Sequence, residues 1–591
     1  MSDEEKTESS NAGSVVGGTP RTAEEHAAAP SAPTDKSAGT SSRAPENSTI
    51  GKTSATEKAP NTVDEFRFWL RAGQLLNPFD FVAVEHERGT TTIGVAREME
   101  LLTDAQGHLS NYVSSNFGDV ADQPNTLRVG TTVVTAGVMA NTGYKLHDRP
   151  DAVEISLPIS SDKRVRFATA SEILVALGIH NMKSRIPAGI IEMSNGTQVP
   201  ISVDGDYLLG PEGAHINASG TSGLATKTSY LMFLLQAIYQ KLTRDVCIIM
   251  FNVKQHDLLH VHEPPSDLSE RDRRIYRSLD LRPEPFPDTE VKYFLPRGVR
   301  GAPNSEHVPR NHQVYAYEFP EARERLDLLF SEISDPQGTI ESIVGYLRDS
   351  PNLIQRKANE ALAAGHPIRT WEDLRAFDDY PDKVVTHPYS LRRFQRHLTR
   401  MTRGNPLFPD AAGEAVNLGD ELSRLRGGGV YVVDMAKIGS TEEQAFIVGD
   451  VVSRLEESYL SNDPNRPRKV VLLIDELNRY APKGERLSAV AEQIIEIART
   501  GRSRGVVLFG AEQFKSAVNR QVTENSSTHV VGRTGSQELE EAAYRFVDKT
   551  TRSSIGRLSK GELVLAHPLF RQPVRVVFPR PAYRRQETQP R

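Results

Sequence analysis

Two adjacent carboxylates, Asp475 and Glu476, follow a continuous apolar run that begins after Lys469. Such a run is typical of a buried parallel strand, and open α/β sheets bind ligands at the carboxyl ends of their strands. There an aspartate can hold the shell of a nucleotide-bound Mg²⁺, and the following glutamate can orient or deprotonate a water molecule. A core strand that runs into an acidic turn is the alternative interpretation.

A second stretch, residues 215–229, has the composition of a phosphate-binding loop and precedes an apolar, helix-like run. Its glycines would turn backbone N–H groups toward phosphate oxygens, its lysine would contact the terminal phosphates, and the next hydroxyl would bind Mg²⁺. The stretch departs from G-x-x-x-x-G-K-[ST], because a threonine precedes the lysine and the first glycine stands one position early. A flexible turn before a helix is the alternative, which the carboxylate pair disfavours. The candidate nucleotide-binding residues are Gly220, Ser222, Gly223, Thr226, Lys227 and Thr228.

Further polar residues surround the next predicted strand, residues 505–511. Gln513, just past its end, could sense the γ-phosphate or position water, and a solvated loop glutamine is the alternative. Several arginines precede the strand. They could stabilise the phosphate of a neighbouring subunit, or could only complement the dipole at a helix C-terminus. These candidates are Arg499, Arg502 and Arg504.

Three more residues, Lys254, Asp257 and Asp434, follow the ends of predicted strands and are weaker candidates for the same site. The histidines show no spacing typical of metal ligands paired with cysteine or glutamate. The sequence therefore predicts no metal site other than that of the nucleotide-bound Mg²⁺, for which Thr228 and Asp475 are the candidate ligands.

The composition sets limits on the setting and the partners of the protein. The 591 residues carry a net charge of −6, so no polycationic surface is predicted, although a channel needs only a locally basic lining. The single cysteine, Cys247, lies in an apolar run and reads as a buried strand residue, which excludes a disulfide framework. No run is long enough for a membrane span, and we expect a cytoplasmic protein.

The chain divides into segments of different composition. Residues 1–61 are rich in Ser, Thr, Ala, Gly, Pro and Glu and predict a disordered tail. Residues 62–209 carry short strands separated by turn signals, which predict a small barrel or sandwich. Alternating βα units predict an α/β core with a mostly parallel sheet, covered on both faces. This core comprises residues 210–260 and 421–580, around a largely helical and loop-rich insert at 261–420, and residues 581–591 form a C-terminal tail.

The order of these motifs resembles the HerA/FtsK superfamily of ring-forming P-loop ATPases, most of all the HerA-type DNA translocases. The resemblance covers residues 77–260 and 425–580. It rests on the hairpin at 189–203, the loop at 220–228, and the Ile-Asp-Glu, Arg-Thr-Gly-Arg and Gln513 positions. The phosphate loop differs from the family's usual G-[ST]-G-K-[ST] and is similar to a variant found in a less studied branch.

The resemblance implies a small N-terminal β-barrel, a RecA-like core, and ATP and Mg²⁺ as ligands. It also implies a homo-oligomeric ring, a hexamer, that moves or unwinds double-stranded DNA beside a nuclease or defence effector. By the same likeness Lys227 contacts the β- and γ-phosphates, Glu476 is the catalytic base, Gln513 is the sensor, and Arg502 or a neighbour acts in trans. Two other functions stay open. One is a nucleotide-binding scaffold with slow or no turnover that assembles partner proteins, favoured by Thr226, and the other is an ATPase that pumps protein.

Overall fold

The computed structural model describes residues 48–121, 123, 128–145, 152–221, 226–254, 258–266, 268–331, 333, 335–350, 354–355, 366–411, 413–460, 466–484 and 487–585. Most of the predicted N-terminal tail lies outside these residues. In the described part of the chain, no helix has the length and apolarity that crossing a membrane requires.

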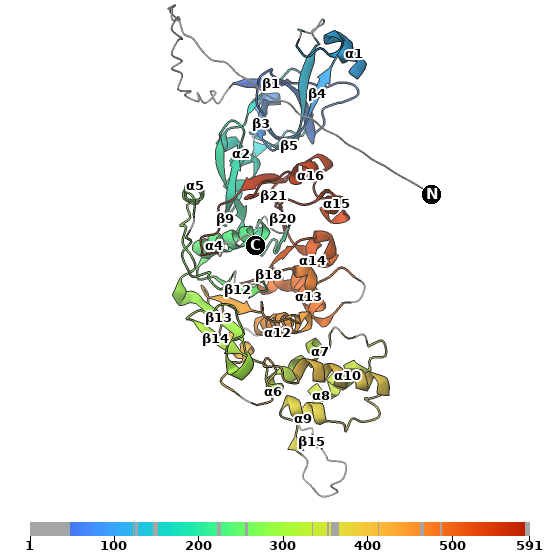
Figure 1. The fold of residues 1–591 in the computed structure, drawn as a ribbon. Helices are drawn as coiled ribbons and strands as arrows, with labels where there is room; N and C mark the ends of the chain where they lie inside the picture. The colour runs from blue at the N-terminus through green and yellow to red at the C-terminus, as the bar shows by residue number, and fades with distance from the viewer. Residues whose placement is uncertain are drawn as a thin grey trace, which may run out of the picture. The chain divides into compact units, whose positions relative to one another are not determined.

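A closed barrel forms the N-terminal module, as predicted (Figure 1). Its strands in barrel order are β1 (Thr49–Thr53), β2 (Glu65–Leu70), β5 (Gly130–Asn141), β4 (Thr91–Thr103), β3 (Phe81–Glu85) and β8 (Arg164–Phe167). Alternate side chains of a strand point into the barrel. In β2, Phe66 and Phe68 are fully buried, whereas Trp69 between the strand's inward positions is exposed. The tail boundary predicted at residue 61 is wrong, because β1 lies before it and closes the barrel between β2 and β8.

The hairpin of β9 (Arg185–Glu192) and β10 (Gln198–Asp204) was assigned by sequence to the barrel domain and belongs instead to the core sheet. Its turn is the predicted Asn-Gly pair, with Gly196 at a φ of 82°. Strand β9 pairs with β22 (Val574–Val577) near the C-terminal end of the chain. The boundary at residue 209 therefore falls within the sheet.

A twelve-stranded sheet forms the core in the order β10-β9-β22-β21-β20-β11-β19-β18-β12-β17-β13-β14. From β20 to β14 every neighbouring pair is parallel, and the strands from β20 back to β10 pair antiparallel. The prediction of a mostly parallel α/β core is confirmed. The parallel strands are β20 (Thr528–Val531), β11 (Ile216–Ser219), β19 (Val506–Glu512), β18 (Lys469–Asp475), β12 (Val246–Asn252), β17 (Val430–Asp434), β13 (Val291–Pro296) and β14 (His312–Tyr315).

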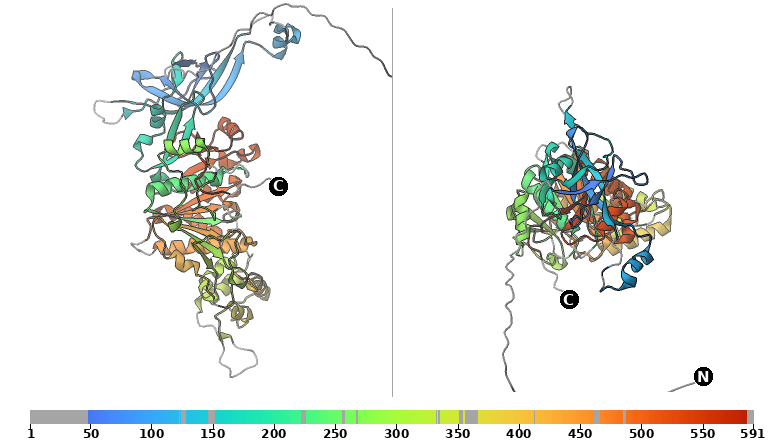
Figure 2. Two further views of the ribbon diagram at one scale, coloured as in Figure 1. Left: turned by 60° about the vertical axis from the view of Figure 1, so that its left-hand side comes forward. Right: turned by 90° about the horizontal axis from the view of Figure 1, so that it is seen from above.

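Helices cover both faces of the parallel region (Figures 1 and 2), which explains why its strands read as unbroken apolar runs. In β12, Ile248 and Met250 point into one core together with helix α4 (Lys227–Leu242). Cys247 and Ile249 point into a second core with α12 (Thr441–Leu460) and α13 (Ala489–Arg504). The predicted burial of Cys247 is confirmed, with no exposed surface.

The insert at 261–420 differs from its prediction, because it contributes two strands, β13 and β14, to the parallel edge of the core sheet. It also contains several helices, separated by loops and short strands. Helices α8 (Thr339–Asp349), α9 (Trp371–Ala376) and α10 (Pro388–Thr402) place Ile343, Trp371 and Phe394 in the same core as α12. The insert is therefore continuous with the core.

Candidate functional site

The carboxyl ends of four neighbouring strands, β11, β19, β18 and β12, bring the predicted polar residues together. Ser219, the last residue of β11, is in register with Glu512, and Ala511 is in register with Asp475 of β18. The segment that follows β11 carries the phosphate loop, and β12 leads to Lys254. Because parallel strands end at one edge of the sheet, motifs far apart in the sequence meet at a single site.

The flanks of the phosphate loop lie against the end of β20. Gly220 has a φ of +156°, and a Cβ added to it would lie 3.3 Å from the Cα of Gly532. The backbone N–H of Thr221 donates to the carbonyl oxygen of Arg533 at 2.8 Å. Thr226, which stands where the motif has glycine, has φ −81° and ψ −50° and needs no glycine conformation. Ser222 and Gly223 lie outside the described residues.

Lys227 is the first residue of α4 and is buried, with 6% of its surface exposed. Within the described part of the chain, no hydrogen-bond acceptor reaches its Nζ. Burial lowers the pKa of Lys227, although the negative charges of Asp475 and Glu476 oppose this. A buried ammonium without an acceptor is costly, and an anionic ligand would remove that cost. The residue thus fits the phosphate contact predicted for it.

The predicted magnesium ligands and the predicted base lie beside each other. Thr228 Oγ1 donates to Asp475 Oδ2 at 3.4 Å. Lys254 Nζ donates to the same Oδ2 at 3.2 Å and also to Glu476 Oε1. Gln513 Nε2 donates to Glu476 Oε1 at 3.2 Å. The structure therefore joins all four predicted residues through side-chain hydrogen bonds and places Lys254, a weaker candidate in the sequence, at their centre.

Glu476 adopts a left-handed backbone conformation, with φ 56° and ψ 45°. For a residue other than glycine this costs roughly 1–2 kcal/mol, and such strain gathers at functional sites. Its backbone N–H donates to Asp475 Oδ1 at 2.9 Å, which helps to hold the turn. Burial would raise the pKa of Glu476, but the hydrogen bond and charge of Lys254 and the Gln513 amide outweigh it and lower the pKa. The carboxylate is thus ionised at neutral pH.

The three candidate arginines lie at the amino ends of the parallel strands, opposite the candidate site. They stand in the last turns of α13, which leads into the amino end of β19. The seven residues of β19 separate that end from Glu512 by about 20 Å. Arg502 donates to the carbonyl oxygen of Glu212 at 3.0 Å, Arg504 pairs with Glu456 at 3.1 Å, and Arg499 pairs with Glu496 at 3.8 Å. They do not join the site of their own chain.

Two buried ionisable residues beside the site were missed by sequence reasoning. Glu512 is fully buried at the end of β19, and burial raises its pKa to about 8, against the charges of Lys515 and Lys227. Burial lowers the pKa of Lys515 to about 7, and its Nζ lies 2.8 Å from Nδ1 of His529. The sequence does place Glu512 next to Gln513 at the end of a predicted strand, and this position could have made Glu512 a candidate for the site as well.

Of the other weaker candidates, Asp434 belongs to a different contact. It accepts from Asn252 Nδ2 at 2.8 Å and from Ser305 Oγ at 2.5 Å, next to the end of β17. Asp257 lies outside the described residues.

No protein-family model and no curated protein matches the chain. Among solved structures, the bacterial conjugative coupling protein TrwB is similar at 13% identity, over 71% of this chain and 94% of that one, with a TM-score of 0.42. VirB4 of Thermoanaerobacter pseudethanolicus is similar at 14% identity, over 67% of this chain and 96% of that one, with a TM-score of 0.40. TrwB in complex with ADP and Mg²⁺ gives 14% identity, coverages of 64% and 87%, and a TM-score of 0.40.

Proposed function

We propose that the protein binds and hydrolyses ATP with Mg²⁺ at the edge formed by β11, β19, β18 and β12. The observation that carries this proposal is Lys227, a buried ammonium at the start of α4 that has no acceptor among the described residues. A helix N-terminus and an unpaired cation together favour a phosphate. The carboxylates of Asp475 and Glu476 influence that ammonium electrostatically and supply the groups that hydrolysis requires.

Each residue of the site has a role that its contacts support. Thr228 and Asp475, already joined by a hydrogen bond, would hold Mg²⁺, which when bound supplies charge neutralisation for the phosphates. Glu476 would accept the proton of the attacking water. The Gln513 amide, bonded to Glu476 Oε1, would keep that carboxylate in position and report on the γ-phosphate. Phosphoryl transfer depends on positioning and electrostatics, and these residue types provide both.

We further propose that hydrolysis drives movement along double-stranded DNA by a homo-oligomeric ring of HerA type. The resemblance to that family supports this assignment. The position of Arg499, Arg502 and Arg504 agrees with it as well, since arginines at the amino end of β19 are too far from the site of their own chain and could reach only that of a neighbouring subunit. A head-to-tail interface that closes into a ring, such as a hexamer, would bring one of them to the next site. A partner nuclease or defence effector belongs to the same proposal.

The exposed face of α10 is our candidate for contact with DNA. Arg392, Arg396 and Arg400 are exposed at intervals of four residues, and the buried Phe394 and Leu398 fix that face outward. Arg400 is held by Glu442 at 2.8 Å, which leaves the other two as the stronger candidates. A motor must grip phosphates without reading bases, so we expect binding that is independent of sequence and steeply dependent on salt.

A second candidate function is a nucleotide-binding scaffold with slow turnover, and the contacts of Lys254 favour it. This ammonium bonds both the candidate Mg²⁺ ligand Asp475 and the candidate base Glu476, so both carboxylates must be released before hydrolysis. An ATPase that pumps protein is a third possibility.

One experiment separates these functions: the rate of ATP hydrolysis with and without duplex DNA at two salt concentrations. Stimulation by DNA that fades at high salt supports the motor. A steady rate that DNA does not change supports a protein pump. A very slow or undetectable rate under all conditions, in a protein that binds ATP tightly in a calorimetric titration, supports the scaffold.

A further inference from the structure

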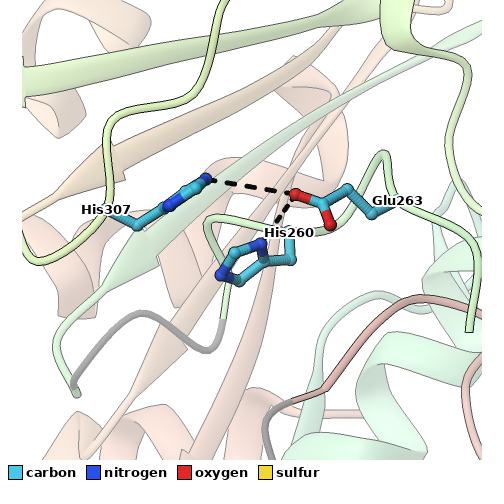
Figure 3. Close-up of side chains that lie close together, drawn as sticks. All are labelled: His260, Glu263 and His307. Carbon is cyan, nitrogen blue, oxygen red and sulfur yellow. Dashed lines mark hydrogen bonds and ion pairs between the residues drawn. The ribbon is translucent and has the colours of Figure 1, made fainter. Parts of the chain in front are cut away.

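A second cluster of ligand-type side chains lies on segments held at the ends of β12 and β17 and uses none of the residues of the nucleotide site. His260, Glu263 and His307 offer ligand atoms that all lie within 4.8 Å of one another (Figure 3). His260 Nδ1 is 2.8 Å from Glu263 Oε1, and His307 Nε2 is 4.0 Å from that same oxygen. The two imidazole rings lie close together, with centroids 4.2 Å apart. One carboxylate oxygen therefore faces two ring nitrogens.

The two segments that carry the cluster are fixed by the ends of β12 and β17. Asn252, at the end of β12, accepts from the backbone N–H of Leu258 at 3.4 Å and donates to Asp434 Oδ1 at 2.8 Å. Asp434 accepts on its other oxygen from Ser305 Oγ at 2.5 Å. The segment of His260 and that of His307 are thus tied together through one carboxylate, so the approach of the histidines does not depend on the cluster itself.

Glu263 is oriented from its other side. Its Oε2 pairs with Arg584 at 2.7 Å, and the backbone N–H of Arg584 donates to the carbonyl oxygen of Glu263 at 2.9 Å. Burial would raise the pKa of Glu263, but the hydrogen bonds from His260 and Arg584 lower it to about 2. The carboxylate is therefore ionised, with Oε2 occupied by the guanidinium and Oε1 directed at the histidines.

We propose that His260 Nδ1, Glu263 Oε1 and His307 Nε2 form a binding site for a divalent transition metal of the zinc class. Two nitrogens and one carboxylate oxygen are a ligand set that Zn²⁺ takes in sites with an open fourth position. Zinc–nitrogen bonds of about 2.0–2.1 Å in a tetrahedron place neighbouring ligand atoms about 3.3 Å apart. The observed separations require only small movements, and the His307 side chain, 38% exposed, has room to make them.

The chemistry of the donors separates this site from that of nucleotide-bound Mg²⁺. Imidazole suits zinc, cobalt, nickel and copper, whereas Mg²⁺ prefers oxygen ligands and keeps its waters. Arg584 on Glu263 Oε2 corresponds to the outer partner that orients a ligating carboxylate in metal sites. Binding through His260 Nδ1 leaves no proton on that atom, so a proton carried there is released to solvent when the metal binds.

The test is titration of the full chain, free of affinity tag and nucleotide and stripped with a chelator, with ZnCl₂ in a calorimeter. We expect one high-affinity site per chain that millimolar Mg²⁺ does not compete for. Cobalt bound in its place should give the visible absorption of a four-coordinate site. Loss of a residue that only hydrogen-bonds to a metal ligand weakens metal binding by roughly 10- to 100-fold. Because His260 and His307 would bind the metal directly, His260→Ala and His307→Ala should each weaken zinc binding by more than that.

His312→Ala is the matched control, since His312 lies on the nearby β14 and its Nδ1 contacts the carbonyl oxygen of Pro309, outside the cluster. That variant should bind zinc as the parent does. Because His307 is half-exposed, its variant should keep the fold, which circular dichroism checks. Zinc affinity unchanged by His307→Ala in a folded protein, or no zinc bound by the parent, would overturn the proposal.

Discussion

Lys254 donates from Nζ to Oδ2 of Asp475 at 3.2 Å, and this is the same oxygen that accepts the hydroxyl of Thr228 at 3.4 Å. The lysine thus compensates the charge of the proposed magnesium ligand in the nucleotide-free chain. Asp475 and Glu476 are adjacent and mostly buried, so without a cation they would repel each other. Mg²⁺ bound by Asp475, as we propose, would therefore compete with the Lys254 ammonium for one carboxylate oxygen.

Replacing that ammonium should make stability depend on Mg²⁺. We expect Lys254→Met to lower the free energy of unfolding of the nucleotide-free protein by roughly 1–2 kcal/mol. This is less than the 3–5 kcal/mol for a fully buried pair, because the Lys254 side chain is 41% exposed and solvent screens it. Denaturant unfolding with and without Mg²⁺ checks this. If Mg²⁺ does not reduce the difference in the free energy of unfolding between Lys254→Met and the parent, Mg²⁺ and Lys254 do not compete.

Lys227→Met should change the free and bound states in opposite directions. Removal of a buried ammonium that has no acceptor among the described residues should stabilise the nucleotide-free protein, which thermal unfolding measures. The same change should weaken ATP binding by about 1.5–3 kcal/mol, the value of hydrogen bonds to charged groups. Lys241→Met, at the other end of α4, is the control and should leave ATP affinity unchanged. Equal calorimetric affinities in Lys227→Met and parent would refute the phosphate contact.

Glu476→Gln keeps the shape of the side chain and removes the base. We expect ATP affinity to be retained and hydrolysis to fall by about 10²-fold or more, the typical effect of losing a general base. Single-turnover measurement of phosphate release separates chemistry from product release. A variant as fast as the parent would leave Glu476 without a catalytic role and would favour a different base.

How far the sequence predicts this site depends on whether the signal is local. The runs at β18 and β19 predicted buried strands because each is apolar on both faces, and their polar ends were therefore visible as a site. Lys254 was a weaker candidate for the site because the sequence around it does not show its contact with Asp475, which lies 221 residues later in the chain. Glu512 was missed because its burial comes from Lys515 and the neighbouring strands, which the local sequence does not show.

The errors in the fold have a related cause. The Asn-Gly turn signal between two apolar runs predicted the hairpin of β9 and β10. A turn signal does not say which sheet a hairpin joins, and β22, near the other end of the chain, pairs with β9. Strand β1 was assigned to the tail because Thr49–Thr53 has a composition close to that of the preceding residues. Pairing with β2 and β8 makes it a strand, and that information is not local.

The arginines of α13 offer a test of oligomeric action. If one of them serves a neighbour's site, its alanine variant should bind ATP and assemble but should not hydrolyse ATP. Mixing that variant with Glu476→Gln subunits should restore part of the activity, because some interfaces then combine an intact arginine with an intact base. Sedimentation measures assembly and phosphate release measures activity. If none of Arg499, Arg502 and Arg504 behaves in this way, the arginine that acts in trans lies elsewhere.

The exposed arginines of α10 should set the salt dependence of DNA binding. Each phosphate contact adds about 0.9 to the slope of log affinity against log salt, so Arg392→Ala with Arg396→Ala should reduce the slope by about one to two. The matched control is Arg273→Ala with Arg277→Ala, an exposed pair with the same spacing on α5 (Glu270–Ser278). Fluorescence anisotropy with labelled duplexes measures both. Equal slopes in the two double variants would remove α10 from the DNA contact.

Glu512 should make stability depend on pH. Its folded-state pKa of about 8 lies above the ordinary value of 4.5, so between these values the folded state binds more protons than the unfolded state. The contribution of Glu512 to the free energy of unfolding therefore decreases as the pH rises from about 4.5 to 8. Glutamine keeps the neutral shape, so Glu512→Gln and the parent should melt alike near pH 5. At pH 9 the variant should melt several degrees higher. Equal melting temperatures at both pH values would show that Glu512 does not carry a buried charge.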